Sequence, residues 1–91
     1  MNGPRGEIEL LINGSMRKLC LTLGALAQLE TAFGCETLTD LQTRLRRLSA
    51  NEMRDVLQIL LCDGSDDASI NDVSPGDAAR AIGEAFHAAL G

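Results

Sequence analysis

The sequence predicts an α+β fold in which an N-terminal β-hairpin packs on a small bundle of about four helices. Two patterns carry this prediction. Apolar and polar residues alternate around an Asn-Gly pair near the N-terminus, and apolar residues recur at helical spacing through the rest of the chain. With 91 residues, of which 45% are hydrophobic and 23% charged, the chain fits one domain, 1–91, with a modest core.

The hairpin is predicted over residues 6–21. Asn13-Gly14 is the preferred pair for a two-residue type I′ turn, and it fixes which residues face each other. The resulting register pairs Ile12 with Ser15, Leu10 with Arg17, Glu9 with Lys18 and Ile8 with Leu19. A hairpin in this register collects its apolar side chains on one face, namely Ile8, Leu10, Ile12, Leu19 and Leu21. Because a two-stranded hairpin is marginal by itself, helices are expected to cover that face.

Two helices are predicted in the first half of the remaining chain. The first, 22–34, begins with Thr22 as a capping residue and ends at Gly34, which suits a left-handed C-terminal position. The second, 38–48, begins after Thr37, which is spaced with Asp40 like a capping box. Leucines spaced three and four apart give it one apolar face, namely Leu38, Leu41, Leu45 and Leu48.

Two more helices are predicted over 49–62 and 75–90. Ser49 and Glu52 form a capping-box signature before a clean apolar stripe. Ser74 caps the last helix and Pro75 takes its first position. Residues 63–73 between these helices are predicted to be an acidic loop with one short turn. Its carboxylates do not follow the spacing of a calcium-binding EF-hand loop.

Composition and motifs argue against several classes of function. The net charge is −5 and the chain has no Trp or Tyr, so it is poorly suited to nucleic acid. No phosphate-binding glycine motif occurs, and no apolar stretch approaches the roughly 20 residues of a membrane span. We therefore expect no nucleic-acid or membrane partner, no cofactor and a cytoplasmic location.

The cysteines and the single histidine offer no evident catalytic or metal site. Cys20, Cys35 and Cys62 are widely spaced, without a C-x-x-C pair. We expect three reduced cysteines, in preference to a disulfide, a zinc site or a nucleophile. His87 lies off the apolar stripe of its helix and is expected on the surface. The sequence therefore predicts a protein that is not an enzyme and has no metal ligands.

Two features favour a surface that binds other proteins. Half of the eight basic residues fall on two successive predicted helices, namely Arg44, Arg46, Arg47 and Arg54. This cluster either contacts an acidic partner or forms a solvated face. Ile59, Leu11 and Met16 lie away from the predicted core, and grouped in space they would form an exposed apolar patch.

Residues 5–62 resemble a family of small tail proteins from gene transfer agents and related phages. The resemblance rests on the hairpin opening in Arg5-Gly6-Glu7 and on the segment 21–30, Leu-Thr-Leu-Gly-Ala-Leu-Ala-Gln-Leu-Glu. Proteins of this family are called tail assembly chaperones or, in older naming, tail tube proteins. The resemblance makes Leu26, Leu29 and Glu30 candidates for packing or for partner contact.

The resemblance implies a non-enzymatic role in building a phage-like tail inside a bacterial host. A tail assembly chaperone would bind the tape measure protein and tail tube protein. It also implies association with phage-like particles. The alternatives are a structural tail or connector subunit, or a small regulatory module such as an antitoxin. Self-association into a homo-oligomer stays open.

Overall fold

The computed structural model describes residues 7–62 and 68–90, and it confirms the predicted α+β architecture. An antiparallel hairpin is followed by four α-helices, with a short 3₁₀ helix before the last. The strands are β1 (Glu7–Ile12) and β2 (Ser15–Cys20), and the helices are α1 (Leu23–Phe33), α2 (Leu38–Arg44), α3 (Ala50–Leu60), η1 (Ala68–Asp72) and α4 (Pro75–Leu90).

The hairpin has the predicted register, with Glu9 opposite Lys18 and Leu10 opposite Arg17. Asn13 and Gly14 both have positive φ, 51° and 80°, as a type I′ turn requires. The turn is also tied to the distant η1 helix, because Asn13 Nδ2 donates a hydrogen bond to Asp72 Oδ2 at 2.8 Å. The local sequence therefore sets the turn, and a contact across 59 residues holds it in place.

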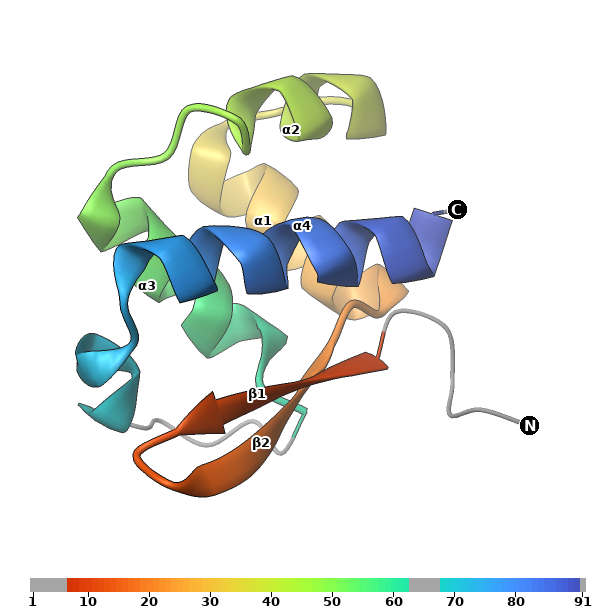
Figure 1. Cartoon of the computed structure of the whole chain (residues 1–91). Coiled ribbons are helices and arrows are strands. Elements are labelled where there is room, and N and C mark those ends of the chain that lie inside the picture. Colours follow the sequence, from red (N-terminus) through yellow and green to blue (C-terminus); the bar gives the residue numbers. More distant parts are fainter. Residues whose placement is uncertain (1–6, 63–67, 91) are drawn as a thin grey trace.

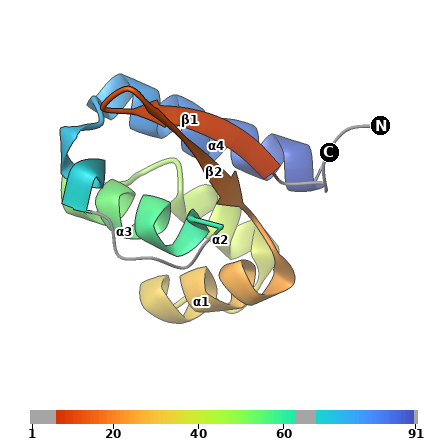
Figure 2. The same cartoon turned by 90° about the horizontal axis from the view of Figure 1, so that it is seen from below.

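The hairpin, α4 and the remaining helices surround one apolar core. In both views α4 runs alongside β1, and α1 lies on the far side of the molecule from α4 (Figures 1 and 2). Helix α2 lies at the end away from the hairpin (Figure 1). The largest fully buried side chains come from β2 and the first three helices, namely Leu19, Leu29, Leu41, Val56, Leu57 and Leu60.

The caps of α1 and α3 are as predicted. Thr22 Oγ1 accepts a hydrogen bond from Ala25 N at 3.1 Å, and Gly34 closes α1 in the left-handed conformation, with φ 66°. Ser49 and Glu52 form a complete capping box at the start of α3. These ends satisfy backbone groups that a helix terminus would otherwise leave unpaired.

Helix α2 is shorter than predicted, because it ends at Arg44 and not at residue 48. The chain leaves the helix through tight turns, with Arg47 N donating to Arg44 O at 3.0 Å. Ser49 must be extended to cap α3, with ψ 168°, so the chain has to change direction before it. Similarly, α3 ends at Leu60, and the predicted 63–73 loop contains η1; residues 63–67 lie outside the described residues.

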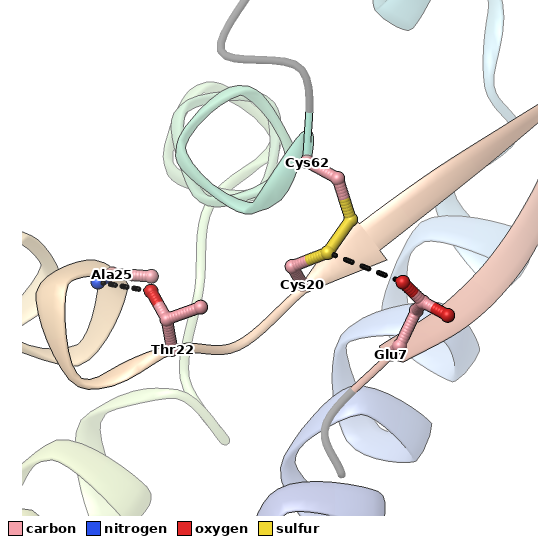
Figure 3. Close-up of a disulfide and its surroundings, with 5 residues drawn as sticks. All are labelled: Glu7, Cys20, Thr22, Ala25 and Cys62. Carbon is pink, nitrogen blue, oxygen red and sulfur yellow. Dashed lines mark hydrogen bonds between the residues drawn. A yellow bond between two sulfur atoms is a disulfide. The ribbon is translucent and has the colours of Figure 1, made fainter. Parts of the chain in front are cut away.

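Cys20 and Cys62 form a disulfide, so the expectation of three reduced cysteines was wrong (Figure 3). Leu61 pairs with Leu19 in an isolated antiparallel bridge, and Cys62 N donates to Lys18 O at 3.0 Å. This short extension of the sheet brings the two Cα atoms to 5.0 Å, within the range a disulfide spans. The sequence spacing could not reveal a pairing that depends on this tertiary contact.

The Glu7 carboxylate lies beside the disulfide, 3.8 Å from Cys20 Sγ (Figure 3). Ligand atoms of Glu7, Cys20 and Cys62 fall within 4.8 Å of one another. A metal would need thiolates, however, and both sulfurs are already joined to each other. The remaining cysteine, Cys35, is free, half-buried and packed against the core. The Cys20–Cys62 disulfide links the end of β2 to the chain after α3.

Candidate partner-binding groove

A groove of about 700 Å³ lies between the α2–α3 segment and α4. Its walls come from two parts of the chain that are far apart in sequence. One wall consists of Gln42, Leu45, Arg46, Leu48 and Met53, and the other of Ala79, Ile82, Gly83, Phe86 and His87. Most of these side chains are apolar, so the groove offers a hydrophobic surface bordered by a few polar groups.

The early end of α2 creates one wall of this groove. Leu45 and Leu48 were predicted to belong to the apolar face of a longer helix. They lie instead in the turn after α2 and are only half-buried, packed against the rim of the core. Met53, in the second turn of α3, is also half-buried. Three large apolar side chains therefore remain partly accessible along the groove.

The arginine cluster does not act as one surface. Arg44 is held within the protein: its guanidinium pairs with Glu52, donates to Arg47 O at 2.6 Å and lies 5.2 Å from the centre of the Phe33 ring. Arg54 Nη1 donates to Asn71 Oδ1 at 3.4 Å, on another part of the surface. Arg46 and Arg47 are exposed, and only Arg46 of the four lines the groove.

The other predicted contact residues are mostly taken up by packing. Leu26 and Leu29 lie in the core, 8% and 0% exposed, which agrees with the packing role of the two considered for them. Glu30, within α1, is half-buried. Ile59 is also half-buried and packs against the core, so the predicted patch with Leu11 and Met16 does not form around it.

Leu11 and Met16 are nevertheless neighbours on the surface. They face each other across the hairpin on its outer side, 60% and 56% exposed. Leu23, at the start of α1, is 83% exposed. The hairpin thus carries a second, smaller apolar surface, which we call the Leu11–Met16 pair.

Sequence reasoning missed the α4 wall of the groove. Ile82 and Phe86 are buried on the apolar face of α4, and His87 is exposed as predicted. The overlooked signal was Gly83, since a glycine within a helical pattern is unfavourable and calls for a packing or functional reason. A Cβ built at Gly83 would meet nothing within 4 Å, so no contact within the described structure requires a glycine there.

The hydrogen bonds from Ser49 N–H and Arg44 to the Glu52 carboxylate give stability a pH dependence. Ser49 N–H, and then the Arg44 guanidinium, donate to the Glu52 carboxylate and hold its pKa below the ordinary value. The folded state therefore prefers the ionised form of Glu52. The stabilisation that the ionised carboxylate gives to the folded state is fully present above the unfolded pKa of about 4.3. This stabilisation is lost as pH falls through the lower pKa of Glu52 in the folded state.

We expect the stability difference between the wild type and Glu52→Gln to shrink as pH is lowered. Urea denaturation of both proteins at about pH 7, 5 and 3.5 measures this. Comparing the two proteins cancels the effects of other titrating groups, such as Asp77, whose pKa is lowered mainly by its hydrogen bond from Arg80. A constant difference across this range would contradict the assignment.

The fold and the groove define a small α+β protein with an apolar groove between its helices. Residues 5–91 match the model of the family described as phage tail tube protein, GTA-gp10. The chain belongs to this family, which confirms the resemblance and extends it beyond residue 62 to the C-terminal helix. It is thus a phage tail or gene transfer agent protein.

Searches of curated proteins and of solved structures returned no match. Within residues 7–62 and 68–90, no helix has the length and apolar character needed to cross a membrane.

Proposed function

We propose that this protein is a tail assembly chaperone that acts in the host cytoplasm by binding the tape measure protein and tail tube subunits. The supporting observation is the groove, an accessible apolar surface in a chain from a family of tail proteins. A protein that handles other polypeptides needs such a surface, and no chemical step is part of this role. We accordingly propose that it is not an enzyme.

A structural subunit of the tail tube is the second candidate. The description of the family as tail tube protein favours it, and so does the Leu11–Met16 pair. The pair lies on the exposed face of a two-stranded sheet, where a neighbouring copy could cover it. The two candidates predict different compositions of the finished particle. A chaperone leaves before the particle is complete, whereas a tube subunit remains in it in many copies.

The test is size-exclusion chromatography with light scattering. The chain is analysed alone and after co-expression with the tape measure protein or the tail tube protein encoded by the same phage or gene transfer agent. A stable complex, together with the chain's absence from purified particles by mass spectrometry, is the result expected of a chaperone. Rings or tubes formed by the chain alone and weakened by Leu11→Asp, with many copies in particles, would establish the structural subunit instead.

The variants for this test must avoid residues that hold the fold. Arg44 pairs with Glu52, and Ile59 packs against the core, so changing either affects folding as well as binding. Arg46 is exposed and lines the groove, which makes it the better choice. Circular dichroism of each variant verifies that its helices are retained.

A further inference from the structure

The groove carries one positive charge, that of Arg46, within an acidic protein. The chain carries 13 acidic and 8 basic residues, yet the ionisable residues that line the groove are Arg46 and His87, with no carboxylate among them. Arg46 stands on the α2–α3 wall and His87 on the α4 wall. An apolar partner segment bearing carboxylates at its edges would therefore match both the apolar lining and its charge.

The secondary structure of the walls favours a helical occupant. All the lining residues lie on helices or in the turn between α2 and α3, so no strand edge offers backbone groups for pairing with an extended peptide. A helix needs no such pairing, because its backbone hydrogen bonds are internal. On α4 the lining runs from Ala79 to His87, about 12 Å of helix at about 1.5 Å per residue. The occupant would contact it over two to three turns.

Gly83 allows such a helix to come close. It lies in the middle of α4, one turn after Ala79 on the same wall, and its outward side is open. A glycine inside a helix costs about 0.5–1 kcal/mol relative to alanine. Gly83 does not have the positive φ that would explain its presence. The close approach of a partner backbone at this position would explain why a glycine stands inside α4.

The charges also distinguish a different protein from a second copy. In a symmetric dimer formed groove to groove, each subunit would bring its own Arg46 and His87 to the interface. Two Arg46 guanidinium groups would then enter one desolvated interface with no carboxylate among the lining residues to offset them, which is unfavourable. An acidic helix from another protein meets no such repulsion.

We infer that the groove binds an amphipathic α-helix of a partner protein, with its small and apolar side chains against Ala79 and Gly83 and its carboxylates beside Arg46 and His87. This inference rests on the proposed function, in which the partner is a tail protein. It adds the location of the contact and the chemistry that the bound segment must have.

The experiment uses overlapping fragments of the tape measure protein, and separately the tail tube protein, as immobilised probes. Two variants address the groove: Gly83→Leu fills it, and Arg46→Glu reverses its charge. Each has a matched control. Gly24→Leu makes the same change at an exposed position of α1, and Arg47→Glu makes the same reversal at an adjacent exposed arginine outside the lining.

We expect each groove variant to weaken binding by about tenfold or more, and each control to bind within about threefold of the wild type. Replacing a carboxylate of the bound fragment by lysine should restore binding to Arg46→Glu. Gly83→Ala, which adds one methyl group in open space, should keep or raise the melting temperature and thereby show that α4 tolerates a side chain there.

The other outcomes each overturn a specific statement. If the wild type binds a probe and both groove variants bind equally well, the inference fails while the proposed function stands. If the wild type binds none of the probes, the proposed function fails and takes the inference with it. If the wild type is a dimer that Gly83→Leu dissociates, a second copy fills the groove and the inference is wrong.

Discussion

Replacing Cys62 by serine is expected to lower the free energy of unfolding by about 4 kcal/mol. The disulfide joins residues 42 apart in sequence, and losing it returns to the unfolded chain the freedom of a loop of that length. The loop includes β2's end, α1, α2 and α3, so the bond restrains more than half of the helical elements. Urea denaturation with and without reductant measures the effect, which should be the same for Cys62→Ser and for reduced wild type.

Cys35→Ser is the matched control for this experiment. Cys35 is free, so its replacement should leave the effect of reductant unchanged. Alkylation followed by mass spectrometry counts the thiols directly: the purified oxidised protein should have one reactive cysteine after unfolding. Three alkylated cysteines in the absence of reductant would show that Cys20 and Cys62 are not joined.

Leu29→Ala is expected to cost about 2–5 kcal/mol of unfolding free energy, the usual range for removing a fully buried leucine side chain. Leu29 is 0% exposed, on the face of α1 that packs toward α2 and α3. The change removes apolar burial and leaves a cavity among side chains that cannot fully close it. Urea denaturation again gives the difference, provided that the slope of the transition is unchanged.

Leu23→Ala is the control, since it makes the same change on the same helix at a position 83% exposed. It should alter the free energy of unfolding by less than about 0.5 kcal/mol. Equal effects of the two changes would mean that α1 does not pack as described. This comparison also separates the two roles considered for Leu29, because a residue used for partner contact alone would change binding and leave stability intact.

Local patterns in the sequence determined much of the fold. Asn13-Gly14 set the turn and therefore every pair of the hairpin, and the side-chain period of two then places Leu10, Ile12 and Leu19 together on the buried face. Thr22 and Gly34 bounded α1, and Ser49 with Glu52 began α3. Each of these signals acts within three or four residues, so no knowledge of the rest of the chain was required.

The candidate site depended on contacts that local patterns do not contain. Four arginines close in sequence were separated in space, because Arg44 turned inward to Glu52 while Arg46 pointed to the groove. The groove itself exists because α4 lies against the α2–α3 segment, and the lining residues of the two walls are at least 26 residues apart along the chain, from Met53 to Ala79. Helical periodicity identifies the buried face of each helix, but not which helix covers it or where the cover is incomplete.

The sequence by itself determined the elements, their order, the hairpin register and, through the segment 5–62, the resemblance to a tail protein family that residues 5–91 confirm. The tertiary structure alone decided the Cys20–Cys62 bond and the groove with Gly83 on its wall. The physical reason is the distance along the chain between the residues that interact. Turns and caps are set by neighbouring residues, whereas a disulfide or a groove forms only where packing brings distant segments together.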